Sequence, residues 1–143
     1  MKRIINIGSL NLDKIYQLPH TPLPGETLTA SSNRIGLGGK GLNQSIAAAR
    51  AEAAVIHAGA VGPDGEPLTA ALREAGADVS LVRVRDTATG HALILVNEKG
   101  NNSIVLSPGA NHTLTINDLD EAIGQGHPGD ILLLQTNTTG TYC

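Results

Sequence analysis

The sequence predicts an α/β fold in which buried parallel strands alternate with helices. Short runs rich in Ile, Val, Leu and Ala recur along the 143 residues, and segments with apolar residues at helical spacing separate these runs. Glycine and proline mark many of the boundaries between the two kinds of segment. The composition agrees, since 41% of the residues are hydrophobic and the net charge is only -3.

The first half of the chain supplies two strand and helix units. Residues 3–9 form a strand, a helix follows Gly41, and residues 54–61 form the next strand. A second helix begins near Pro67 and ends at Gly76, because glycine accepts the backbone conformation of a helix end. The apolar face of this helix and the strand after it consist of Leu68, Ala71, Leu72, Ala75 and residues 79–84.

The second half continues the pattern. A third helix begins near Thr115, because Asp118 stands three residues later as in a capping box. Glycines at positions 124 and 126 end it, and it is predicted to bury Leu119, Ala122 and Ile123. Residues 131–134 are wholly apolar, which indicates a central strand of the sheet.

Two stretches alternate polar and apolar residues and predict antiparallel strands instead. Residues 16–34 contain the alternating run 26–30, and residues 90–106 form a hairpin that turns at residues 99–101. A small sheet built from these hairpins would have one face that no helix covers. We therefore expect it to be a lid or a dimer surface.

Charge and aromatic content argue against nucleic acid and membrane partners. The chain is mildly acidic and its aromatic residues are two tyrosines, so it offers neither a basic surface nor a platform for stacking bases. The N-terminal apolar run is broken by Asn6 and Gly8 and is too short for a signal peptide or a membrane span. One cysteine, at position 143, allows no internal disulfide, and we expect a cytoplasmic location.

Residues 36–41 form a glycine-rich turn that opens onto a helix. Backbone N–H groups of such a turn can approach an oxygen-rich ligand closely, at the positive end of the helix dipole. The glycines match the G-x-G-x-x-G fingerprint, but the turn follows an amphipathic strand and the next strand ends without a carboxylate, so a nicotinamide site is not expected. The P-loop pattern fails as well, because Arg34 replaces its first glycine and Gly41 follows Lys40.

Asn11 and Asp13 lie just beyond the first strand. In an extended segment their spacing places both side chains on one face, with Leu10 and Leu12 on the other. An amide and a carboxylate together can bind vicinal hydroxyls, because each hydroxyl needs a donor and an acceptor. A turn at the strand end is the alternative interpretation of this pair.

The histidines show no metal-ligand spacing with one another, with the cysteine or with carboxylates. No metal site is predicted on these grounds. We expect each of them to be a surface or loop residue: His20, His57, His91, His112 and His127.

Six short motifs stand in one order along the chain, at residues 8–13, 24–27, 38–44, 61–65, 89–92 and 108–111. In this order and spacing they resemble the N-terminal part of the ribokinase-like (PfkB) carbohydrate kinases, over residues 3–135. The resemblance implies an α/β, Rossmann-type three-layer sandwich with a small β-sheet lid. The implied lid segments are about 14–34 and 90–107, and in this family the lid closes over the sugar and often forms a homodimer contact.

The resemblance also implies which residues bind the sugar, which is expected to be ribose, another pentose or a nucleoside. By this resemblance, Asn11 and Asp13 bind the sugar hydroxyls. The glycine turn and the helix start contact the same sugar through Gly38, Gly39, Lys40 and Asn43. Two apolar lid positions, Ala92 and Ile94, pack on the sugar ring. After the strand that corresponds to residues 131–134, the family commonly has Gln-x-Glu, where this chain has Gln135-Thr136-Asn137. Asn137 can bind a hydroxyl but lacks the charge, so the resemblance does not imply ribose in particular.

Two further motifs of the family do not occur in the sequence. One is the Gly-Ala-Gly-Asp motif, which carries the aspartate base and an anion hole, and the other is the Asn-x-x-Glu motif, which assists the Mg²⁺ and phosphate groups. We therefore expect residues 1–143 to be an incomplete domain that lacks the C-terminal half, holds no catalytic residue and is inactive alone. The ATP and Mg²⁺ sites of the complete enzyme would lie largely outside it. A non-catalytic sugar-binding or dimerisation module is the alternative.

Overall fold

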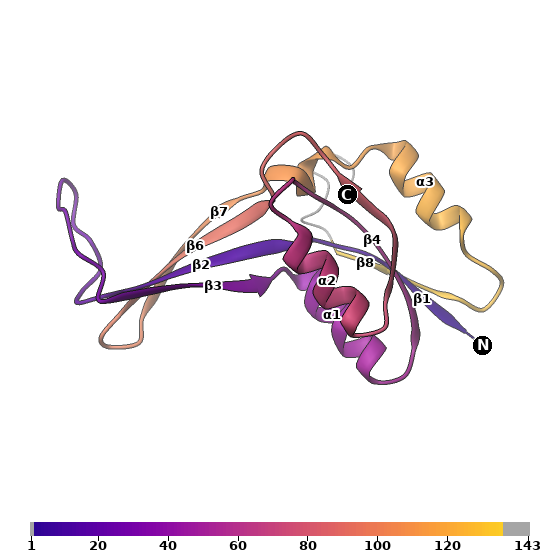
Figure 1. Cartoon of the computed structure of the whole chain (residues 1–143), viewed down its shortest axis with the longest axis horizontal. Coiled ribbons are helices and arrows are strands. Elements are labelled where there is room, and N and C mark those ends of the chain that lie inside the picture. Colours follow the sequence, from indigo (N-terminus) through magenta and orange to yellow (C-terminus); the bar gives the residue numbers. More distant parts are fainter. Residues whose placement is uncertain (1, 136–143) are drawn as a thin grey trace.

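The structure, a computed structural model, describes residues 2–135. Within them a parallel sheet has the strand order β5-β4-β1-β8, formed by Asp78–Val84, Ala54–Val61, Arg3–Ile7 and Ile131–Leu134. Helices α1 (Lys40–Arg50) and α2 (Glu66–Glu74) cover one face and lie side by side, whereas α3 (Ile116–Gly124) packs on the other face (Figure 1). This arrangement confirms the predicted three-layer α/β fold.

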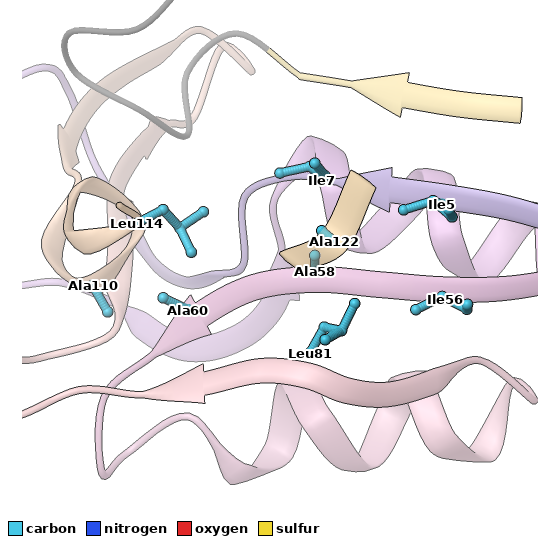
Figure 2. Packing of buried hydrophobic residues seen from close by; sticks show 9 residues of the cluster. All are labelled: Ile5, Ile7, Ile56, Ala58, Ala60, Leu81, Ala110, Leu114 and Ala122. Carbon is cyan, nitrogen blue, oxygen red and sulfur yellow. The ribbon is translucent and has the colours of Figure 1, made fainter. Parts of the chain in front are cut away.

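The alternation of side chains along each buried strand builds a separate core on either face of this sheet. Figure 2 shows the core beneath α3, where the strands contribute residues such as Ile5 and Ala58, α3 contributes Ala122, and Ala110 comes from the 3₁₀ helix η1 (Gly109–Thr113). The core on the α1 and α2 face includes Val55, Val61, Leu42, Leu68 and Leu72. The apolar faces that the sequence pattern predicted for these strands and helices are therefore the faces that are buried.

The helix ends agree with the sequence prediction. The Thr115 hydroxyl caps α3 by accepting from the Asp118 N–H, and the Asp118 carboxylate accepts from the Thr115 N–H in return. Helix α2 ends just before Gly76, which has a φ of +94°. One part of the α3 prediction is wrong, because Ile123 is half exposed while Ala122 is fully buried.

A second sheet has the order β3-β2-β6-β7, formed by Ser32–Gly38, Asn11–Leu18, Gly90–Asn97 and Asn102–Ser107. It extends to the left beyond the helices (Figure 1). The predicted hairpin of residues 90–106 is confirmed, with Gly100 at a φ of +80° in its turn. The sheet is not wholly antiparallel as predicted, because β2 and β6 run parallel to each other.

The predicted strand at residues 26–30 is wrong. These residues belong to the connection between β2 and β3, where the Glu26 carboxylate accepts the Leu23 N–H at 2.9 Å and pairs with His20 at 2.8 Å. Prolines at positions 22 and 24 and Gly25, with a φ of +79°, turn the chain here. The alternation of polar and apolar residues is typical of a strand, but the hydrogen bond and the ion pair of Glu26 hold this segment in a turn outside the sheet.

Strand β8 lies at the edge of the parallel sheet among the described strands, and its expected central position in a complete domain stays a prediction. Within residues 2–135 it pairs only with β1, and its Ile131, Leu132 and Leu134 are 43–59% exposed. Apolar composition alone does not reveal how many neighbours a strand has. None of the described helices combines the length and the apolar character that crossing a membrane requires.

Candidate functional site

The polar pair of the first motif begins β2 and faces one side of the second sheet. Leu10 and Leu12, on the opposite side, are 0% and 8% exposed in the core beneath α1 and α2. This burial forces Asn11 and Asp13 to the other face of the extended chain, as predicted. The segment pairs with β3 and β6 along its whole length, so the alternative of a turn is wrong.

Strand pairing brings the predicted site residues of three strands onto that same face. Asn11 pairs with Gly38 of β3, and Asp13 pairs with Ala92 of β6. Ile94 pairs with Ile15, two residues further along the same face. Directly paired residues share a face in both parallel and antiparallel ladders, so a polar end passes into an apolar floor along this side of the sheet.

The glycine turn lies against this pair because it carries no side chains. A Cβ atom on Gly38 would overlap the Asp13 carboxylate, so the carboxylate lies directly over that backbone. Gly39 has a φ of +100°, and a Cβ there would overlap the Ser9 carbonyl oxygen. Gly39 therefore requires glycine both for space and for its conformation, whereas a side chain at position 38 would displace the Asp13 carboxylate from the turn.

Helix α1 begins immediately after this turn. Lys40 is its first residue, Asn43 lies in its first turn, and both are exposed. No side chain caps the helix, and the Leu42 N–H donates to the Ser9 carbonyl at 3.1 Å. The N–H groups of Lys40 and Gly41, at the helix start, are therefore the ones left for a ligand beside the turn. A neutral or anionic oxygen placed there would be stabilised by the helix dipole.

The Asp13 carboxyl is perturbed by its surroundings. Burial raises its pKa above the usual value, and the positive charge of Arg34 opposes only part of that rise. Arg34 pairs with Ile15 and so lies on the same face of the sheet as Asp13. Sequence reasoning did not predict a role for this arginine, and only the β2–β3 register identifies it as a neighbour.

The motifs at residues 61–65 and 89–92 meet where the chain enters β6. Thr89, which is fully buried, donates its hydroxyl to Asp64 at 2.6 Å and accepts the N–H of Gly62 at 2.9 Å. The bonds that the hydroxyl and the N–H of Thr89 donate to Asp64 hold the pKa of Asp64 below its usual value. The motif at residues 61–65 is thereby joined to the strand that carries Ala92.

The motif at residues 108–111 ends at a buried amide. Asn111, in η1, is 2% exposed and hydrogen-bonds to both Leu10 and Asn11. Its distance of about a hundred positions from Asn11 explains why only the folded chain shows the contact.

His57 corrects a prediction, because it is fully buried in β4 and is not a surface or loop residue. Ser45 of α1 accepts from the Asn6 amide at 2.8 Å and bridges to His57 Nδ1 at 2.7 Å, while Asn6 also donates to the Gly41 carbonyl. Burial lowers the pKa of His57 to about 4, so the ring is neutral at neutral pH. Its position in an otherwise apolar strand was the available signal.

The last described residue, Gln135, accepts the Ser9 N–H at 3.1 Å through its side chain. The first strand and the strand before Gln135 are thereby tied together next to the polar pair. Asn137, the remaining predicted sugar contact, lies outside the described residues.

Carboxylate, histidine and cysteine side chains do not gather into a cluster in the part of the chain that the structure describes. Residues 2–135 contain no group of three or more His, Cys, Asp or Glu side chains that could hold a metal ion. Asp13, the acid of the polar pair, lies beside Arg34 and the glycine turn.

A parallel sheet that carries a glycine turn and a polar pair beyond the carboxyl end of a strand defines an α/β domain of the kind that binds small ligands. The sequence profile of the family described as pfkB family carbohydrate kinase matches residues 1–138 of this chain. The chain belongs to this family, as the motifs predicted.

Known relatives agree with this assignment. Ribokinase from Haemophilus influenzae is 37% identical over 140 residues, which make up 96% of this chain and 46% of the relative. A deoxyribokinase from Salmonella typhi is 36% identical over 132 residues, 90% of this chain and 43% of that protein. Arabidopsis thaliana ribokinase, solved in complex with ribose and ATP, matches with a TM-score of 0.80 at 30% identity, over 96% of this chain and 46% of its own. The chain thus spans less than half the length of these relatives.

Proposed function

We propose that the protein carrying this chain transfers a phosphoryl group from ATP to a hydroxyl of a sugar, and that these residues bind the sugar. The observation that carries the proposal is the shared face of Asn11, Asp13 and Gly38 beside the start of α1. Family membership supplies the reaction class, and this face supplies a place for a polyhydroxyl ligand.

The chemistry of that face favours a sugar over an anion. Asp13 accepts hydrogen bonds from hydroxyl groups, whereas its charge would repel a phosphate or carboxylate placed against it. Ile94 continues the same side with a partly exposed apolar side chain, which suits the C–H face of a furanose or pyranose ring, and Ala92 lies buried beside Asp13. The relatives named as ribokinase and deoxyribokinase make a pentose the first candidate, and a nucleoside the next.

We further propose that the second sheet, residues 11–18, 32–38, 90–97 and 102–107, acts as a lid and as a homodimer contact. Ile104 and Leu106 of β7 are 52% and 62% exposed and lie on the face that carries Ile94 and Ala92. A second copy of this sheet would cover such apolar area. Sedimentation of the purified protein tests the proposal, and a monomer at all concentrations would contradict it.

The 143 residues alone are proposed to bind a sugar without transferring phosphate. The sequence lacks the Gly-Ala-Gly-Asp motif, and the part of the chain that the structure describes holds no metal-binding cluster. Calorimetry of this polypeptide with pentoses measures binding, and an ATP-dependent assay measures turnover. Turnover by the isolated polypeptide would contradict the proposal, and binding without turnover in any longer form would favour the non-catalytic module.

The test of the main proposal is an assay of ATP-dependent phosphorylation with ribose, deoxyribose and nucleosides, using the protein that carries this chain. Asp13→Ala is expected to raise KM for the best substrate strongly. Asp120→Ala is the matched control, because Asp120 is an exposed aspartate of α3, on the far side of the parallel sheet. Equal kinetics for the two variants would refute the assignment of Asp13.

A further inference from the structure

Asn111 lies where the two sheets meet, since η1 packs against both β4 and β6. Its side chain bonds to both polar backbone groups of Leu10. The Leu10 N–H donates to Asn111 Oδ1 at 2.9 Å, and Asn111 Nδ2 donates to the Leu10 carbonyl at 3.1 Å. Because a backbone N–H can only donate and a carbonyl can only accept, these two bonds determine which end of the Asn111 amide carries the oxygen.

The same bonds determine the orientation of the neighbouring amide. The remaining hydrogen of Asn111 Nδ2 points to a side-chain atom of Asn11 at 2.7 Å. A donor requires an acceptor, so that atom is Asn11 Oδ1 and the amide nitrogen occupies the other end. Within residues 2–135, the Asn11 nitrogen has no hydrogen-bond partner. It is a free donor on the face of β2 that also carries the Asp13 carboxylate.

We propose that Asn111 is a positioning residue, which holds the Asn11 amide nitrogen toward the sugar so that the site presents a donor beside an acceptor. This inference rests on the proposed function. A hydroxyl that accepts from Asn11 and a neighbouring hydroxyl that donates to Asp13 match this pair, so the site selects a vicinal diol. Without Asn111 the Asn11 amide can turn over, and two acceptors would then face the ligand.

Gly90 supports the arrangement. A Cβ atom at this position would overlap Asn111 Nδ2 and would lie 2.6 Å from Asn11 Oδ1 and 2.7 Å from the Pro108 carbonyl oxygen. The two amides can therefore meet only because residue 90 has no side chain. The motifs that contain Asn11, Gly90 and Asn111 converge on this one hydrogen bond.

The test is a double-mutant cycle in the protein that carries this chain, with KM and kcat measured for its best sugar. Asn111→Ala is expected to raise KM about tenfold when Asn11 is present, and by less than about twofold in the Asn11→Ala background, because its effect passes through Asn11. A role confined to the Leu10 backbone would cost the same in both backgrounds, and that result would overturn the inference.

A second measurement needs no Asn111 variant and applies if Asn111→Ala does not fold. The side-chain amide resonances of Asn11, identified by their loss in Asn11→Asp, are expected to shift on addition of ribose while those of Asn111 stay in place. If ribose shifts other resonances but not those of Asn11, the inference is overturned and sugar binding stands. If the wild-type protein neither binds nor phosphorylates any sugar, the proposed function fails as well, which is a distinct result.

Discussion

Gly39→Ala should destabilise the protein more than Gly76→Ala, although both glycines have similar backbone conformations. Their φ angles are +100° and +94°, so each alanine variant bears a conformational strain of about 1–3 kcal/mol. The two sites differ in space. A Cβ at Gly39 would overlap the Ser9 carbonyl oxygen and lie 3.0 Å from the Asn11 nitrogen, whereas a Cβ at Gly76 would have nothing within 4 Å.

The difference between the two variants therefore measures the close approach of the glycine turn to the polar segment. Forcing a methyl group into packed backbone costs about 1–3 kcal/mol, so we expect the free energy of unfolding of Gly39→Ala to lie below that of Gly76→Ala by about this amount. Urea unfolding followed by circular dichroism supplies both values. Equal losses would refute the packing argument. A weaker sugar affinity in Gly39→Ala alone would link the same contact to binding.

The remaining predictions concern the polar pair and the buried polar groups. Asp13→Asn is expected to cost about 1–3 kcal/mol of sugar binding, because the ionised carboxylate is the hydrogen-bond acceptor. The variant should also lose the decline of binding at acid pH, because the raised pKa of Asp13 brings its protonation closer to neutral pH. Calorimetry across pH measures both effects. The folded pKa of His57, about 4, lies below the unfolded value of 6.5. Burial of the neutral ring therefore costs no stability above pH 6.5, and the free energy of unfolding falls by about 3 kcal/mol as the pH drops toward 4. Unfolding titrations should show a flatter pH dependence in His57→Gln, and an unchanged profile would count against the burial of a neutral ring. Thr89→Val should lose about 1–3 kcal/mol of stability, since Asp64 and the Gly62 N–H both lose a partner, and a melting temperature equal to that of the wild type would contradict this.

Patterns of short range identified most of the elements. The apolar run of residues 54–61 and the Thr115 capping box were both predicted, because an unbroken apolar run and a capping box are signals carried by residues within a few positions of one another. The strand predicted at residues 26–30 was wrong, because a local pattern can also mislead. Its alternation was a local signal, and the turn bonds of Glu26 prevailed over it.

Pairings between distant segments could not be predicted from composition. The pairing of β2 with β6 is a matter of chain topology, and its register decides that Ala92 and Ile94 share a face with the polar pair. Burial of His57 depends on Asn6 and Ser45, which reach it from β1 and α1. A lone histidine in an apolar strand carries no sign of these partners.

The residue order therefore contained the family, the three-layer class and the chemistry of the polar pair, since each rests on residue types at close spacing. Folding alone decided how that chemistry is presented. The orientation of the Asn11 amide comes from Asn111, about a hundred positions later, and the room for their contact comes from Gly90. A hydrogen bond needs a donor and an acceptor brought within about 3 Å, and only the packing of the two sheets brings these groups together.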